Sequence, residues 1–308
     1  MESEPWRFPM STVPTALPVL PASVHLAPGV GGLPIVRVTG RAGSAEVYLH
    51  GAHVASWVPA GGAPVLWMSA GSRFTPGTAI RGGIPICFPW FGPNAADATA
   101  PAHGFARVTE WQLSGAAEVG DDVVLTFHLT DSPATRASAW PHPFEARYTV
   151  TVGATLRLEL TVINRDTMAV TVEEALHSYF AIDDIHRTTV AGLEGVPFLD
   201  KVGGATPTPG SPEPVSFTAE TDRVYSGTTA TTTIDDGTRR IAVTKTGSDS
   251  TVVWNPWIDK AAAMADFGSQ EWTGMVCVET CNVGADAITL DPGASHTMTA
   301  EFTVTPAA

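Results

Sequence analysis

The stretch VVLTFHLT, residues 123–130, decides the fold class because apolar and polar side chains alternate along it. Alternate side chains of an extended strand point to opposite faces, so this segment presents one apolar face to a core. The apolar face carries Val123, Leu125, Phe127 and Leu129. The segment LRLELTV, residues 156–162, repeats the pattern. Both segments are typical of strands that are buried on one side.

Turn signals join further segments of this kind along the chain. Asp236-Gly237 lies between two arms rich in Thr, Val and Ile (TTTIDDGTRRIAVTKT, residues 231–246), which is a strong hairpin signal. Gly153 marks another turn, and the Asp-Pro-Gly at residues 291–293 leads into a closing strand. That strand places on one side Met298, Ala300, Phe302 and Val304. No stretch shows the periodicity of a long helix, so we predict an all-β protein.

The domain organisation follows from composition, because a chain of 308 residues has room for one large domain or two ordinary ones. No break in composition appears between Leu33 and Thr305, which favours one domain. We predict a single large antiparallel β-sandwich over residues 29–308, preceded by a loose proline-rich extension at residues 1–28. The segment KVGGATPTPGSPE, residues 201–213, is predicted to be an exposed loop.

The charge balance limits the partners that the chain can bind. It has 31 Asp and Glu against 17 Lys and Arg, and a formal net charge of −14. Nucleic acids and anionic membranes need a basic protein face, so neither is expected as a partner. An anionic ligand must therefore be bound by a few local cations. We expect a small-molecule ligand and a chain that is monomeric or weakly homodimeric.

The cysteines and the first residues indicate the compartment. The chain has three cysteines, an odd number in a protein too large to depend on disulfides, which fits a reducing environment. Their spacing is not that of a zinc site. The first residues carry acids before any base and are interrupted by prolines, unlike a secretory signal. No apolar run is long enough to cross a bilayer, so we expect a cytoplasmic protein.

The loop RGGIPICFPWFGPNAADATAPAHGFAR, residues 81–107, combines Gly, Pro and aromatic residues with an arginine at each end and an internal histidine. Such a long loop is costly to order and is usually functional. Guanidinium binds carboxylate or phosphate in a bidentate fork, so Arg81 and Arg107 predict one wall of an anion-binding pocket. The alternative is that both arginines are surface charges and His103 is a packed turn residue.

Two apolar strands carry further candidates for chemistry. Alternation in MAVTVEEALHSYFAIDD places on one face Ala175, His177 and Tyr179. In MVCVETCNV it groups Cys277, Glu279 and Cys281. His177 is either a hydrogen-bonded core residue or a catalyst, and Glu279 either faces solvent or is a functional carboxylate, because buried glutamates need partners. A weaker case for a metal site rests on Asp183, Asp184 and His186.

An ordered set of segments, from about Val36 to the carboxyl terminus, resembles the aldose 1-epimerase superfamily. Within it the resemblance is to the glucose-6-phosphate 1-epimerase (hexose-6-phosphate mutarotase) family. The segments are LHGAHVASWVP (49–59), PVLWMS (64–69), AIRGGIPICFPWFGP (79–93), AHGFAR (102–107), ALHSYF (175–180), ETDRVY (220–225), WNPW with KAAAMAD (254–266) and MVCVETCN (275–282).

The resemblance implies a β-sandwich of the galactose mutarotase type with a sugar-binding groove across one sheet. It also implies an isomerase that interconverts the α and β anomers of a hexose 6-phosphate, with D-glucose 6-phosphate as the expected substrate. His177 would be the general acid at the ring oxygen and Glu279 the general base at the anomeric hydroxyl. The substrate-binding positions would be Arg81, His103, Arg107 and Asp222, with the arginines at the phosphate. Neither a cofactor nor a metal ion is implied.

Other functions remain open from the residues alone. An aldose 1-epimerase for free hexoses would use the same histidine and glutamate, but a neutral substrate gives no reason for two arginines. A non-catalytic sugar-phosphate-binding protein would have no use for the acid-base pair. A glycoside hydrolase would normally use two carboxylates working together, so we rank it last.

Overall fold

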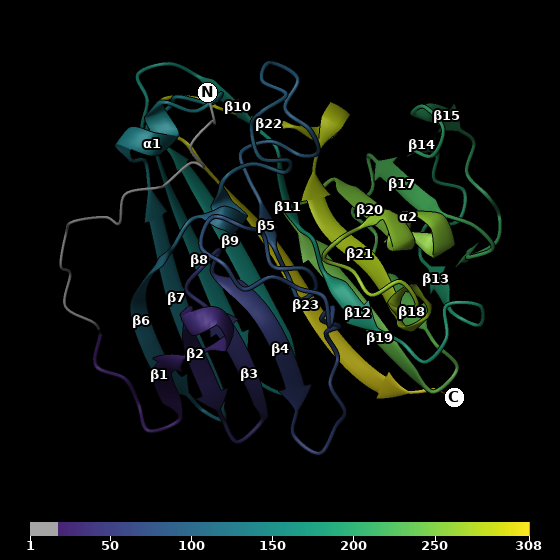
Figure 1. Cartoon of the computed structure of the whole chain (residues 1–308), viewed down its shortest axis with the longest axis horizontal. Helices are drawn as coiled ribbons and strands as arrows, with labels where there is room; N and C mark the ends of the chain where they lie inside the picture. Colours follow the sequence, from purple (N-terminus) through teal and green to yellow (C-terminus); the bar gives the residue numbers. More distant parts are fainter. Residues whose placement is uncertain (1–17, 308) are drawn as a thin grey trace.

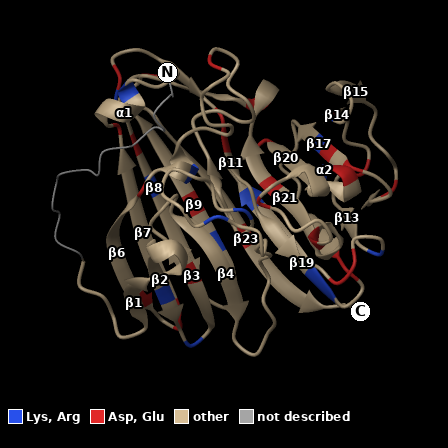
Figure 2. Ribbon diagram, in the orientation of Figure 1, with Lys and Arg blue, Asp and Glu red and all other residues tan. Residues whose placement is uncertain are grey.

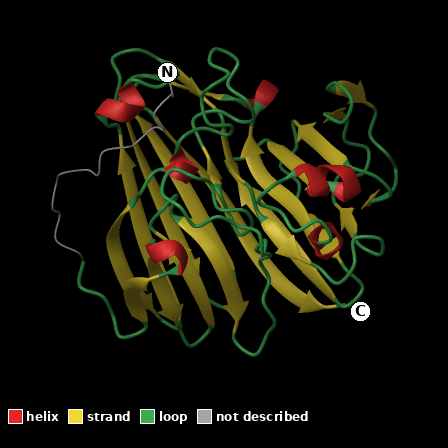
Figure 3. Cartoon of the chain, viewed as in Figure 1, coloured by secondary structure: helices red, strands yellow, loops and turns green. Residues whose placement is uncertain are grey.

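The computed structural model describes residues 18–307, and β-strands make up most of it (Figures 1 and 3). Within those residues the strands form two large sheets and two small ones, and paired strands run antiparallel. The apolar faces of the sheets meet in a shared core. The predicted all-β class and antiparallel sandwich are therefore confirmed.

The nine-stranded sheet contains the segments whose alternation predicted the fold. In β7 (Asp122–Thr130) the apolar side chains are buried and those between them are partly exposed. The predicted turns at Gly153 and Gly237 join β8 to β9 and β18 to β19, and Gly237 has a φ of 83°. The strand order is β16 (Val215–Ser216), β13 (Thr189–Ala191), β18 (Thr232–Asp235), β19 (Arg239–Thr246), β23 (Ser295–Pro306), β9 (Leu156–Asn164), β8 (Phe144–Val152), β7 and β6 (Gln112–Val119).

A four-stranded sheet covers the β6–β9 end of the nine-stranded sheet (Figure 1). The Trp57 indole N–H donates a hydrogen bond of 3.2 Å to the Gly153 carbonyl, which joins the two sheets. The strands of the four-stranded sheet, in order, are β1 (Val24–Pro28), β2 (Pro34–Thr39), β3 (Gly43–Tyr48) and β4 (His53–Pro59). Residues 1–17 of the predicted extension lie outside the described residues, and its last residues form β1, which pairs with β2.

The eight-stranded sheet packs on the other side of the core, where β21 contacts β23. Its strand order is β15 (Thr206–Thr208), β14 (Phe198–Asp200), β17 (Thr221–Ser226), β20 (Ser250–Asn255), β21 (Met275–Asn282), β11 (Glu174–Leu176) and β5 (Ile86–Cys87), with β12 (Tyr179–Ala181) also paired to β21. The valines of β21 face the core, so its other face carries Cys277, Glu279 and Cys281.

The remaining elements are short. A two-stranded sheet consists of β10 (Val170–Val172) and β22 (Ile288–Leu290). The helices are α1 (Pro133–Arg136), α2 (Trp257–Ala263) and the 3₁₀ turns Val30–Gly32, Ala106–Val108, Glu271–Gly274 and Gly284–Asp286. Within residues 18–307, each helix is too short to cross a membrane.

A buried carboxyl group anchors β11 to β21. Glu174 has no solvent exposure, and its Oε1 accepts a hydrogen bond of 2.9 Å from the Asn282 amide. His296 Nε2 lies 3.3 Å from the same oxygen. Burial raises the pKa of Glu174 from 4.5 to about 8, although the Asn282 hydrogen bond opposes this shift. The folded protein therefore keeps a proton on Glu174 at pH values where the unfolded chain has lost it.

This proton makes the stability depend on pH. Because the folded pKa is raised, the contribution of Glu174 is fully present below pH 4.5 and is lost as pH rises through about 8. We expect the free energy of unfolding of the wild type to fall relative to Glu174→Gln between pH 5 and pH 8.5, by an amount on the order of several kcal/mol. Urea unfolding of both proteins at three pH values measures this difference. A difference that stays constant with pH would contradict the assignment.

Candidate active site

Strand register brings the two candidate proton-transfer groups together. Residues directly opposite each other in antiparallel strands share a face of the sheet. The pairs that flank His177 and Glu279 have a common register: Ala175 with Cys281, and Tyr179 with Cys277. His177 therefore lies opposite Glu279 on the face turned away from the core. The predicted grouping of side chains on both strands is confirmed.

The His177–Glu279 pair is buried and in contact. Nε2 of His177 lies 3.5 Å from Oε1 of Glu279, and the two side chains are only 9% and 1% exposed. The alternative in which Glu279 faces solvent is therefore wrong. His177 Nδ1 and Glu279 Oε2 are also buried, and neither has a hydrogen-bond partner among residues 18–307. Buried polar atoms are rarely left without a partner, so the pair retains capacity to bond a ligand.

Burial sets the charge state of this pair. It lowers the pKa of His177 well below 6.5, and the charges of Arg107 and Arg81 lower it further. Burial also raises the pKa of Glu279 well above 4.5, with a further contribution from the carboxylate of Asp222. Both shifts favour the uncharged form of each group in the free enzyme. One group can give a proton while the other takes one.

His103 lies beside this pair at the end of a tightly folded loop. Its ring centroid is 5.7 Å from that of His177, and Phe91 packs against its other side at 4.7 Å. The loop turns back at Gly104, where φ is 76° and a Cβ would overlap the Phe88 carbonyl. The Gly92 N–H donates to His103 Nδ1 at 3.3 Å, which leaves the proton of the neutral ring on Nε2.

Burial keeps His103 neutral. It lowers the pKa of this histidine well below 6.5, and the nearby charge of Arg107 adds to the shift. A neutral imidazole with its proton on Nε2 can donate a hydrogen bond to a ligand oxygen. His103 is packed in a turn, as the alternative interpretation states, but it also contacts the ring of His177.

Arg81 is held in place by other residues of the site. Its Nε and Nη2 donate to one carboxylate oxygen of Asp266 at 3.2 and 3.1 Å, and its Nη1 donates to the Tyr179 hydroxyl at 3.0 Å. Tyr179 in turn stacks on His177, with 4.7 Å between ring centroids and 9° between ring planes. Burial opposes the charge of Arg81, but Tyr179 and Asp266 outweigh it and raise the pKa of the guanidinium.

Arg107 is placed differently, because its charge has no nearby counterion. Its Nη2 donates to the Ala102 carbonyl at 2.8 Å, and its buried Nε has no partner among the described residues. No carboxylate of residues 18–307 lies within 4.0 Å of it. Burial lowers the pKa of Arg107, and the charge of Arg81 lowers it further. An anion placed between the two arginines would offset both the burial of the Arg107 charge and its repulsion by Arg81.

Asp222 completes the set of predicted site residues. It lies on β17 opposite Trp254 of β20, whose own partner on β21 is Cys277, two residues from Glu279. Burial raises the pKa of Asp222, while nearby lysines oppose the shift. The structure thus brings all six predicted positions to one face of the eight-stranded sheet.

Comparison with known proteins supports the same assignment. The aldose 1-epimerase family model matches residues 34–303. A Salmonella typhimurium protein named "putative glucose-6-phosphate 1-epimerase" is 42% identical over 238 residues, which are 77% of this chain and 79% of that protein. A protein of the same name from Cenchrus ciliaris is 37% identical over 259 residues, 81% of this chain and 78% of that one.

The match to the family covers most of the chain. The chain belongs to the aldose 1-epimerase family. It is accordingly an enzyme, an epimerase that interconverts sugar anomers. A crystal structure of a Salmonella typhimurium protein described as a "putative mutarotase" has the same fold, with a TM-score of 0.87 and 34% identity over 95% of this chain and 97% of that one. The predicted galactose mutarotase type of sandwich is confirmed.

Some residues of the family site were not assigned a role from the sequence. Tyr179 was placed on the face of His177, but its bond to Arg81 was not foreseen. Asp266 lies in the KAAAMAD segment, 185 residues from Arg81, so only the resemblance drew attention to it. Asp183, Asp184 and His186, the weaker metal candidate, do not form a group of ligands; the structure has no such group among residues 18–307.

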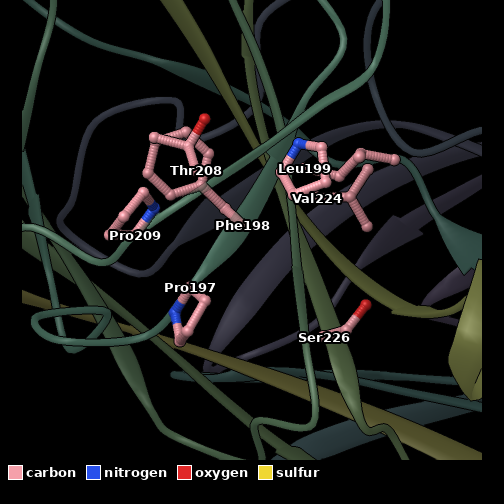
Figure 4. A pocket seen from close by; sticks show the side chains of 8 residues that line it. Pro197, Phe198, Leu199, Thr208, Pro209, Val224 and Ser226 are labelled. Carbon is pink, nitrogen blue, oxygen red and sulfur yellow. The ribbon is translucent and has the colours of Figure 1, made fainter.

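A separate apolar cavity lies beside β14 and β17 (Figure 4). Its volume is about 570 Å³, and no titratable side chain lines it. Acid-base chemistry needs titratable groups, so this cavity is not the place of the reaction. The lining residues are Pro197, Phe198, Leu199, Pro207, Thr208, Pro209, Val224 and Ser226.

Proposed function

We propose that this epimerase interconverts the α and β anomers of a hexose 6-phosphate, with D-glucose 6-phosphate as its substrate. The observation that carries the proposal is a buried acid-base pair beside an arginine that has no carboxylate partner among the described residues. The names of the relatives at 37–42% identity support the same substrate.

The acid-base pair fits the chemistry of anomer exchange. Ring opening removes a proton from O1 and delivers one to the ring oxygen; rotation about C1–C2 and closure on the other carbonyl face reverse these transfers. The net proton change is zero, so one acid and one base suffice. His177 is proposed as the acid at the ring oxygen and Glu279 as the base at O1. These roles need the proton on His177, so the bound substrate is proposed to favour the ionised form of the pair over the uncharged form that burial favours in the free enzyme. Each such transfer is typically worth about 10²- to 10⁴-fold in rate.

The arginines favour a phosphorylated substrate over a free hexose. A phosphate monoester carries about 1.5 to 2 negative charges at pH 7. The chain has a net charge of −14, and its basic residues are sparse along the ribbon (Figure 2). Overall repulsion must then be overcome by local charge-assisted hydrogen bonds. Arg107, partly buried and without a carboxylate partner among the described residues, is the proposed phosphate ligand; Arg81 is proposed to lie at the edge of the phosphate site.

The remaining site residues are proposed to orient the sugar. His103 would donate from Nε2 to a hydroxyl of the sugar, and Asp222 would accept from one. Trp254, whose ring lies 6.0 Å from that of His177, provides an apolar surface for the C–H groups of the sugar. The scheme requires no cofactor and no metal ion, because proton transfer is its only chemistry.

A comparison of substrates tests the proposal. Freshly dissolved α-D-glucose 6-phosphate, α-D-glucose and α-D-galactose are each followed by polarimetry with and without the enzyme. We expect the enzyme to accelerate the first reaction most, with kcat/KM for the phosphate ester at least about tenfold above that for either free sugar. Equal or greater acceleration of a free sugar would replace the proposal with a free-hexose epimerase.

The setting of the enzyme is also a proposal. Its cysteines Cys87, Cys277 and Cys281 are all free and buried, which suits a reducing cytoplasm. We propose a cytoplasmic enzyme that acts as a monomer or weak homodimer on a small-molecule sugar phosphate, with no nucleic-acid or membrane partner. Gel filtration across a range of protein concentrations tests the oligomeric state.

A further inference from the structure

Lys201 lies at the active site although it begins the segment predicted to be an exposed loop. It directly follows β14, and its N–H donates to the Asp222 carbonyl at 2.8 Å. Leu199 of β14 pairs with Val224 of β17. Continuing this register by two residues places Lys201 opposite Asp222, on the face that carries Glu279. The backbone thus directs Lys201 toward the candidate acid-base pair.

A short chain of side-chain contacts leads from Lys201 to His177. Nζ of Lys201 lies 5.2 Å from the ring centroid of Phe91. Phe91 packs edge-on against His103, and His103 packs against His177. The positive charge of Lys201 contributes to the lowered pKa values of both histidines and opposes the raised pKa of Glu279. Its ammonium group therefore lies within electrostatic reach of every proton-transfer group of the site.

The charge balance of the site separates Lys201 from the other cations near it. Arg81 is neutralised by Asp266, and Lys260 by Glu220 at 2.6 Å. Lys201, like Arg107, has no carboxylate within 4.0 Å among residues 18–307. Among the described residues, the site thus holds two positive charges that are in no close ion pair, which matches the nearly two negative charges of a phosphate monoester. Phe91 supplies only a weak interaction with the ammonium group.

We propose that Lys201 is a substrate-binding residue that sets the preference for a phosphorylated hexose, its ammonium group contacting the phosphate from the side of Phe91 and Asp222. The inference rests on the proposed function and adds a residue to it. Lysine suits this role because its four-carbon stem is flexible and its ammonium group binds phosphate as a point charge. It moves from the ring of Phe91 to the phosphate when the substrate binds.

The test compares Lys201→Met and Lys201→Arg with the wild type on D-glucose 6-phosphate and D-glucose. Loss of a hydrogen bond to a charged group should lower kcat/KM for the phosphate ester by about 10- to 150-fold in Lys201→Met, and much less for glucose. Lys201→Arg keeps the charge and should recover most of the loss. Inorganic phosphate, used as a competitive inhibitor, should bind more weakly to Lys201→Met by a similar factor.

Lys260→Met is the matched control, because it removes the same charge from a lysine that is already paired with Glu220. We expect its ratio of kcat/KM for the two substrates to stay within about threefold of the wild type. If Lys201→Met keeps the wild-type ratio, or lowers both rates equally, Lys201 does not bind the phosphate, and the inference is overturned while the proposed function stands. If the wild type itself does not act on glucose 6-phosphate, the proposed function fails and the inference falls with it.

Discussion

Replacing Glu279 with glutamine is expected to lower kcat by about 100-fold or more, and His177→Asn is expected to do the same. Each change keeps the approximate shape of the side chain and removes its ability to exchange a proton with the substrate. Glu279 is 1% exposed and lies 3.5 Å from Nε2 of His177, so no other described carboxylate is placed to replace it at this histidine. Substrate affinity should stay within about tenfold of the wild type, because the phosphate ligands are intact.

Binding and folding must be measured beside turnover. Both variants remove a buried titratable group, so circular dichroism and the midpoint of thermal unfolding establish that each is folded. The competitive inhibition constant of inorganic phosphate reports on the anion site separately from the chemistry. A folded variant that retains near wild-type kcat would remove its residue from the mechanism. A variant whose phosphate affinity collapses together with kcat would point to a structural role.

Replacing Arg107 with methionine is expected to decide the substrate class. Loss of a charge-assisted hydrogen bond should reduce kcat/KM for D-glucose 6-phosphate by about 10- to 150-fold, and that for free glucose by much less. Arg107 has no carboxylate partner in the described part of the chain, so its removal does not leave a buried carboxylate without its counterion. The two substrates are compared in one protein, which separates a lost phosphate contact from a distorted loop.

Arg81→Met offers a contrast within the same site. Sequence reasoning predicts the same selective loss for Arg81 as for Arg107. The structure changes this expectation, because Arg81 fixes the Tyr179 hydroxyl and the Asp266 carboxylate, and Tyr179 stacks on His177. Its loss should therefore lower the rates with both substrates. Equal losses with both substrates in Arg107→Met would show that the phosphate assignment is wrong.

Local sequence patterns predicted the fold class, because strand alternation and tight turns each depend on residues that are close together in the chain. Alternation in residues 123–130 and the turn at Gly237 each involve neighbours in the chain, and both are present as β7 and the β18–β19 hairpin. The short helix α2 and the 3₁₀ turns carry too few residues for a periodic signal. Strand order within the sheets depends on pairings between distant segments, which alternation does not specify.

The site was predictable only in part, for a related reason. Alternation put His177 and Glu279 each on a face, but their meeting depends on the register of two strands about a hundred residues apart, and it was the family resemblance that paired them. The Arg81–Asp266 ion pair spans 185 residues, and no local signal marks it. Composition correctly described most of residues 201–213 as exposed, yet it could not show that strand β14 carries Lys201 into the site.

The most direct test of the central claim is anomer exchange at equilibrium. Exchange NMR spectroscopy on the anomeric protons of D-glucose 6-phosphate measures the rate of interconversion without any coupling enzyme. We predict an exchange rate that rises in proportion to the concentration of the wild-type enzyme and falls by about 100-fold or more with Glu279→Gln at the same concentration. An exchange rate that is the same with and without wild-type enzyme, in a sample that is folded and binds inorganic phosphate, would contradict the account.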